Sequence, residues 1–126
     1  MSISSIATNK APSAVGPYSQ GIKANSLIFT SGQLPIVPET GELLKNDIKK
    51  ETRQCLENVN SILKEAGATL ENVVKVNIYI VNMDDFSSIN EVYEEYFNEH
   101  KPARSCVEVS RLPKDGNIEI EAIAIL

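Results

Sequence analysis

The chain has 126 residues, enough for one domain with a hydrophobic core of its own. Its 12 Lys and Arg residues stand against 17 Asp and Glu residues, and the net charge of -5 disfavours the phosphate contacts on which nucleic-acid and anionic-membrane binders depend. No apolar run approaches the ~20 residues of a membrane-spanning helix, and the start "MSISSIATNK" lacks a signal-peptide pattern. We therefore expect one cytoplasmic domain over residues 1–126 that binds small molecules or proteins, not nucleic acid or membranes.

The first strand signals lie in the N-terminal third of the chain. A weak one, "SQGIKAN", begins at Ser19, and a stronger one, "SLIFTSGQ", covers Ser26 to Gln33. Their closeness favours a hairpin with antiparallel pairing. The following "PIVPETGE" has the Pro and Gly content of a loop.

Two amphipathic helices are predicted further along. The first runs from about Asp47 to Ala66 and is stopped by Gly67. The second begins at Asp84 or Asp85, both plausible N-caps, and ends near Phe97. The apolar stripe of the first helix, with its three- and four-residue steps, consists of Ile48, Thr52, Cys55, Leu56, Val59, Ile62 and Leu63.

Three more strands are predicted, at Asn72–Val81, Arg104–Ser110 and Asn117–Leu126. The second helix lies between the first two of them, which indicates a right-handed parallel crossover. Parallel and antiparallel pairs together give an α+β fold, with one mixed sheet and two helices.

Alternation sorts the strand residues into two faces. We expect the helices to cover Val74, Val76, Ile78 and Ile80, together with Val107 and Val109 or with Ile118, Ile120, Ala122 and Ala124. The opposite face then carries Lys75, Asn77, Tyr79, Arg104, Cys106, Glu108, Glu119, Glu121, Ile123 and Ile125. Because this face is half apolar and two helices cannot cover both sides, we expect self-association.

Cysteine and histidine give little sign of a metal site. Cys55 and Cys106 are the two cysteines and His100 the one histidine, and they form no CxxC or ligand cluster. We read Cys55 as core packing and His100 as a surface loop residue.

Three motifs resemble one known family. They are "GPYSQG" at Gly16–Gly21, "TSGQLP" at Thr30–Pro35, and the long "PARSCVEVSRLPKDGNIEIEAIA" near the C-terminus. Together they are similar to the arginine-bearing RidA branch of the RidA/YjgF family, the reactive intermediate (enamine/imine) deaminases, over essentially the whole chain. The resemblance implies a chorismate-mutase-like fold, here a single six-stranded mixed sheet with two helices on one face, and a homotrimer with its sites between subunits.

The resemblance also implies a chemistry. Substrates would be small 2-imino or 2-enamino acids such as 2-aminoacrylate, hydrolysed to 2-keto acids and ammonia without a cofactor or metal. The matching catalytic residues are Arg104, for the substrate carboxylate, and Glu119, for the attacking water. The matching substrate-binding residues are Tyr18, Ser31, Gly32, Asn90 and Cys106.

The chemistry of the two catalytic candidates fits these roles. A planar guanidinium such as that of Arg104 binds a carboxylate through two parallel hydrogen bonds, although a strand-end arginine can equally be a surface residue or an intersubunit ion-pair partner. Glu119 can orient a water and accept its proton, best if its pKa moves towards neutrality. The alternative is that Glu119 and Glu121 lie on a solvated face, which is the interpretation we adopt for Glu121.

The binding candidates have simpler alternatives. Cys106 would be a nucleophile if Arg104 favoured its thiolate, but imine hydrolysis needs no covalent step, so we predict a pocket-wall residue. Ser31 and Gly32 are expected to offer backbone N–H groups to the carboxylate, or else form a plain turn. For Tyr18 the alternatives are substrate binding and closure of a subunit interface. For Asn90 they are a place near the pocket and an ordinary position on the helix. The sequence does not decide between them.

Two classes of function compete at this point. One is an imine hydrolase that protects the cell from reactive metabolites, and the other is a non-catalytic keto- or amino-acid sensor or chaperone-like module. Both need Arg104, whereas only the hydrolase needs Glu119. RNA cleavage fits poorly with the acidic charge balance.

Overall fold

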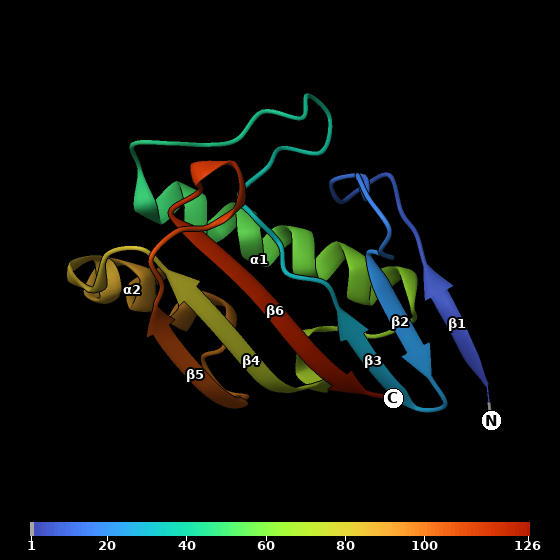
Figure 1. Ribbon diagram of the computed structural model, residues 1–126. Helices are drawn as coiled ribbons and strands as arrows, with labels where there is room; N and C mark the ends of the chain where they lie inside the picture. Colours follow the sequence, from blue (N-terminus) through green and yellow to red (C-terminus); the bar gives the residue numbers. More distant parts are fainter. Residues whose placement is uncertain (1) are drawn as a thin grey trace.

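The computed structural model describes residues 2–126 and contains a six-stranded mixed sheet (Figure 1). The strands lie in the order β1-β2-β3-β6-β4-β5, in which β4 and β5 are parallel and all other neighbours antiparallel. Their bounds are β1 Ile3–Ile6, β2 Gly21–Ala24, β3 Leu27–Thr30, β4 Val73–Ile80, β5 Ala103–Glu108 and β6 Ile118–Ile125. The predicted α+β architecture is confirmed. The segment β1 shows no strong strand pattern, because Ile6 is its one buried residue.

Two helices cover one face of the sheet (Figure 1). The helix α1 (Ile48–Glu65) lies where the sequence predicts a helix, and it begins after Asp47, whose carboxylate accepts a hydrogen bond from the Lys50 N–H. The helix α2 (Phe86–Tyr96) follows the 3-10 helix η2 (Met83–Asp85). Asp85 is its N-cap residue, as predicted, but the Asp85 side chain makes no capping hydrogen bond, whereas the Asn82 side chain caps η2. Two further 3-10 helices are η1 (Leu70–Asn72) and η3 (Pro113–Asp115). Within residues 2–126 we find no helix long and apolar enough to cross a membrane.

The core lies between the helices and the sheet. Alternate residues of β6 are buried there, and they are the predicted Ile118, Ile120, Ala122 and Ala124. They pack with apolar residues of the other elements, including Ile28, Leu56, Val59, Ile62, Leu63, Val76, Ile78, Ile80, Ile89 and Val92. Cys55 is fully buried in this cluster, which confirms its packing role.

The predicted face of β5 is wrong. In the parallel pairing with β4, Arg104 is opposite Val76 and Cys106 is opposite Ile78. Paired residues of neighbouring strands point to the same face, so Arg104 and Cys106 lie on the face that the helices cover. Glu108 shares that face through its partner Ile80, whereas Val107 is exposed on the other side.

Val74 is a second correction on the neighbouring strand. A register shift between Val73 and Lys75 breaks the alternation of β4 at its start. As a result Val73 is fully buried and Val74 is exposed, whereas Val76, Ile78 and Ile80 keep their predicted place in the core.

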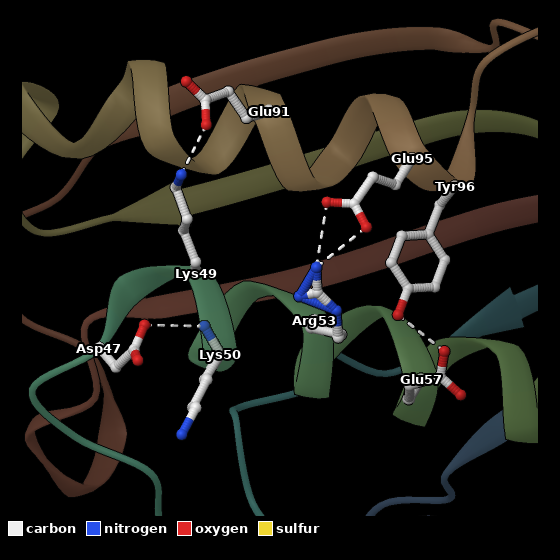
Figure 2. Close-up of polar contacts among 8 residues, drawn as sticks. All are labelled: Asp47, Lys49, Lys50, Arg53, Glu57, Glu91, Glu95 and Tyr96. Atoms are coloured by element: carbon white, nitrogen blue, oxygen red, sulfur yellow. Dashed lines mark hydrogen bonds and ion pairs between the residues drawn. The ribbon is translucent and has the colours of Figure 1, made fainter.

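Polar contacts fix α2 against α1 on the outer side of the helix layer, as Figure 2 shows. Lys49 pairs with Glu91 at 2.6 Å and Arg53 with Glu95 at 2.9 Å. The Tyr96 hydroxyl donates a hydrogen bond to Glu57 at 2.7 Å. Exposed ion pairs of this kind contribute little each, so the apolar layer beneath them supplies most of the packing energy.

Two buried amides hold the loops that lead into the sheet. The Gln20 side chain accepts a hydrogen bond from the Thr8 N–H and donates to the carbonyls of Thr8, Ala11 and Pro12, which fixes the chain between β1 and β2. Asn58 on α1 donates to the carbonyls of Leu34 and Ile36, at 3.2 and 2.9 Å. Both loops are therefore anchored from inside the protein.

Replacing Asn58 tests this anchoring. Asn58→Leu removes the donor to both loop carbonyls and leaves these groups without partners, so we expect a loss of about 3 kcal/mol in the free energy of unfolding. Urea unfolding at one fixed protein concentration measures it. Asn60→Leu, two residues along the same helix at a half-buried position, is the matched control. Equal stabilities of the two variants would contradict the anchoring role.

Candidate active site

All predicted site residues except Cys106 line one of two separate pockets. The first, which we call the Glu119 pocket, has a volume of about 770 Å³ and is lined in part by Tyr18, Ser31, Gly32, Lys114, Glu119 and Glu121. The second, the Arg104 pocket, has a volume of about 440 Å³ and is lined by Asn90, Tyr93, Glu94, Phe97, Lys101, Pro102 and Arg104. One pocket opens on the uncovered side of the sheet and the other beside α2.

Arg104 is held by residues of α2. Its Nη1 donates a hydrogen bond to the Asn90 side-chain oxygen at 2.7 Å. Its Cζ lies 4.7 Å from the centre of the Tyr93 ring and 5.5 Å from that of Phe86, distances at which an aromatic ring attracts a cation. The guanidinium is thereby held by one hydrogen bond and by two aromatic rings.

Asn90 is thus placed beside Arg104 and not on an ordinary exposed surface. Phe86 and Tyr93 were not predicted as site residues. Both belong to the apolar stripe of α2, which the sequence pattern reads as core, and the pattern gives no sign that two of its rings face a cation.

Glu119 lies on the opposite face of the sheet. Along β6, Glu119 and Glu121 alternate with the buried isoleucines, and their partners on β4 are Tyr79 and Asn77. Burial raises the pKa of Glu119 above its usual value, and the negative charge of Glu121 raises it further. A proton acceptor closer to neutrality is what base catalysis at neutral pH requires.

Glu121 is more than a residue of a solvated face. Its Oε2 accepts hydrogen bonds from the Tyr79 hydroxyl at 3.0 Å and from the Asn77 amide at 3.1 Å. These bonds hold its carboxylate in the same pocket as that of Glu119. The alternation along the sequence predicts that Glu119 and Glu121 share a face, but it does not show that Tyr79 and Asn77 of β4 bind Glu121.

Gly32 leaves the space that the Glu119 carboxyl occupies. A Cβ atom at Gly32 would lie 2.7 Å from the Glu119 Cδ and 2.8 Å from its Oε2. Ser31 next to it is engaged in structure: its N–H donates to the Gln20 carbonyl at 2.9 Å and its hydroxyl to the Ser19 carbonyl at 2.6 Å. The expected pair of free amides is therefore reduced to the Gly32 N–H.

Cys106 and Tyr18 differ in their surroundings. Burial raises the pKa of the Cys106 thiol, and the nearby Arg104 offsets this only in part, so the thiolate is not favoured. Cys106 packs against the core and lines neither pocket, which places it behind the site. Tyr18 is half exposed at the edge of the Glu119 pocket.

His100 is exposed, with its Nε2 2.6 Å from the Val73 carbonyl, a structural contact.

No group of three or more His, Cys, Asp or Glu side chains suited to a metal ion occurs in the part of the chain that the structure describes. The arrangement instead offers a cation for an anionic ligand in one pocket and, in the other, two carboxylates of which Glu119 has a raised pKa.

Comparison with known proteins agrees with these features. Residues 8–126 match a family model described as endoribonuclease L-PSP. A 2-iminobutanoate/2-iminopropanoate deaminase of Salmonella typhimurium is 49% identical over 123 residues, which cover 95% of each chain. The chain belongs to the RidA/YjgF family.

Other members of the RidA/YjgF family match over nearly their whole length. A RutC family protein of Pyrococcus abyssi is 60% identical over 119 residues, 94% of each chain. The crystal structure of Escherichia coli TdcF with bound serine has a TM-score of 0.93 and 47% identity, and covers 98% of each chain.

The geometry at Gly32 can be tested by one substitution. Gly32→Ala places a methyl group where the Glu119 carboxyl lies, so we expect the carboxylate to be displaced. Any activity that depends on this carboxylate should fall at least tenfold, with little change in folding. A crystal structure of the variant would show the displacement. Gly41→Ala, in an open loop at the rim of the same pocket, serves as the control: its φ of +76° costs some stability, but the added methyl group contacts nothing and leaves Glu119 in place. A Glu119 side chain that keeps its position in Gly32→Ala would contradict this account.

The pKa of Glu119 can be measured directly. Carbon-13 NMR titration of the side-chain carboxyls should give Glu119 a pKa above the usual glutamate value. Glu121→Gln removes the neighbouring negative charge, so the pKa of Glu119 should fall, whereas Glu71→Gln on η1 should leave it unchanged. An unchanged pKa in Glu121→Gln would show that the two carboxylates do not interact.

Proposed function

We propose that the protein hydrolyses small 2-imino and 2-enamino acids, such as 2-iminopropionate, to 2-keto acids and ammonia, and that its site is assembled between subunits of a homotrimer. The observation that carries the proposal is the presence in one chain of both groups that the reaction needs: the Arg104 guanidinium, held by α2, and the Glu119 carboxylate, whose pKa is raised. The names of the Salmonella typhimurium relative and of similar deaminases support the reaction class.

Two copies of the chain are needed because of the sheet itself. Arg104 lies on the helix-covered face of the edge strand β5, whereas Glu119 lies on the uncovered face of β6, and β4 separates the two strands. In a 2-imino acid the carboxylate is bonded directly to the reacting carbon, so both residues must contact groups one bond apart. Within one chain they cannot, and a second copy supplies the missing half.

The uncovered face provides a surface for this assembly. Its apolar half lies on β3 and β6, where Phe29 pairs with Ile123 and Leu27 with Ile125. All are partly or well exposed in the single chain, and Phe29 and Ile125 are 39% and 44% exposed. Burying such a patch is favourable by roughly 25 cal/mol per Å² of apolar surface, which makes this face the expected interface of the trimer.

The proposed reaction needs only water as a second reactant. Arg104 binds the carboxylate of the imino acid through two hydrogen bonds and so fixes the imine carbon. Glu119 orients a water whose oxygen bonds to that carbon, and the water proton passes through Glu119 to the nitrogen. The remaining hydroxyl proton follows to the nitrogen as the C–N bond breaks, which releases ammonia and the 2-keto acid.

Two other functions are less well supported. A pure sensor would use the Arg104 pocket but has no need of Glu119 with its raised pKa. The family model's description names a ribonuclease, but the net charge of -5 and the two carboxylates of the Glu119 pocket oppose the binding of a phosphate backbone.

The proposal is tested by following keto acid release from 2-iminopropionate and subtracting the spontaneous hydrolysis. We expect Glu119→Gln to lower the protein-dependent rate by roughly 10²–10⁴-fold, the usual contribution of a general base. Arg104→Lys should lose most of that rate too, since an ammonium group cannot make the two-pronged contact. Cys106→Ser, the matched control behind the site, should keep most of it. A parent protein without any excess rate would refute the hydrolase.

Mixing the two inactive variants tests the intersubunit site. If Arg104 and Glu119 of different copies form one site, trimers refolded from equal amounts of Arg104→Lys and Glu119→Gln chains contain about a quarter intact sites by chance pairing. Activity should therefore return to about that fraction of the parent. Refolded mixtures as inactive as the separate variants would mean that one chain supplies both residues.

A further inference from the structure

The Tyr93 hydroxyl lacks a hydrogen-bond partner although it is buried. It is the one buried side-chain polar atom without a partner in residues 2–126, and the residue is only 8% exposed. Buried polar groups are normally paired, and an unpaired one costs stability. A phenylalanine would keep the ring contacts without that cost. The hydroxyl therefore indicates a partner that the free chain does not contain.

The position of Tyr93 limits what that partner can be. Tyr93 lines the Arg104 pocket, one helical turn after Asn90, and its ring lies 4.7 Å from the Arg104 Cζ. The same ring also packs on Phe97, with ring centres 4.8 Å apart. The ring that carries the hydroxyl thus lies in the same pocket as the guanidinium, and an anion is the ligand that a guanidinium selects.

The protonation state of Tyr93 makes the hydroxyl a donor. Burial raises the pKa of Tyr93 to about 12, with a smaller opposite effect of Arg104. At neutral pH the group is therefore a neutral phenol with a proton to donate. A carboxylate offers about four lone-pair sites, of which a two-pronged arginine contact uses two, so it can also accept from a neighbouring phenol.

We propose that Tyr93 is a further substrate-binding residue: its ring supports the Arg104 guanidinium, and its hydroxyl donates a hydrogen bond to the carboxylate that Arg104 binds. This inference rests on the proposed function. Because the hydroxyl is covered in the free chain, binding includes a small movement of the side chains beside it.

Removal of the hydroxyl alone provides the test, with Tyr96 as the matched control. Tyr96 is on the same helix, but its hydroxyl is paired with Glu57 on the outer surface (Figure 2). The probe is pyruvate, the keto acid product of 2-iminopropionate, titrated calorimetrically into parent, Tyr93→Phe and Tyr96→Phe. We expect Tyr93→Phe to weaken pyruvate binding about tenfold, the effect of one hydrogen bond to a charged group. Tyr96→Phe should bind like the parent.

The melting temperature separates a binding role from a structural one. Without pyruvate, Tyr93→Phe should melt at or above the parent, because no hydrogen bond is lost in the free protein. Pyruvate should then raise its melting temperature less than that of the parent. A variant that melts clearly below the parent, or that loses the parent's oligomeric mass, would overturn the inference, since the hydroxyl would then have a partner within the protein assembly.

Arg104→Lys distinguishes failure of this inference from failure of the proposed function. If the parent binds pyruvate, Arg104→Lys binds it poorly and Tyr93→Phe binds it normally, Tyr93 is not a ligand residue and the proposed function stands. If the parent binds no pyruvate, or Arg104→Lys binds it normally, the proposed function fails and the inference fails with it.

Discussion

The alternation of side chains along β6 is the constraint on which the rest of the structure depends. This strand lies between β3 and β4, and every second residue, from Ile118 to Ala124, belongs to the core. The residues in between are therefore forced to the uncovered face, where Glu119 and Glu121 begin the row and Ile123 and Ile125 end it. One strand thus fixes the core, the two carboxylates and the apolar patch. A shift of its register by one residue would bury both carboxylates.

The Arg104 pocket depends on a different element. β5 is an edge strand that pairs only with β4, and its residue Arg104 contacts α2. The helix contributes Phe86, Asn90 and Tyr93 at three- and four-residue steps, which brings all three to the side that faces Arg104. The same helix packs on α1, and the contacts of Figure 2 join the outer sides of the two helices.

Much of the fold could be predicted from the sequence, because periodicity reports directly on burial. The stripe of α1 and the alternation of β6 are both as expected, and the motif residues Arg104, Asn90, Gly32 and Glu119 all line pockets. The face of β5 could not be predicted in this way. Alternation gives two faces but not which of them is covered, and on an edge strand both faces are partly exposed. Only the pairing of β5 with β4 decides it.

The position of the Tyr93 ring beside Arg104 could not be predicted from the sequence either, but for a different reason. Its place in the apolar stripe of α2 is real, since the ring packs on Phe97, but the same ring also faces a cation. A one-dimensional pattern assigns one environment to each residue. A residue at the border of the core has two, and contacts between distant segments, here α2 and β5, are needed to show the second.

The separation of Arg104 from Glu119 by the sheet also has a chemical consequence. A guanidinium and a carboxylate on one face, within reach of each other, form an ion pair, which occupies the hydrogen-bond donors of the arginine and lowers the pKa of the acid. Either effect would impair the proposed reaction, since the arginine must be free for the substrate and the acid must accept a proton near neutral pH. On opposite faces of one chain the two groups cannot neutralise each other, and Arg104 instead rests on neutral partners, an amide oxygen and two rings. In the proposed assembly a second copy brings them to the same site, where the carboxylate of the substrate would be the anion that the guanidinium holds and Glu119 would be left to the water.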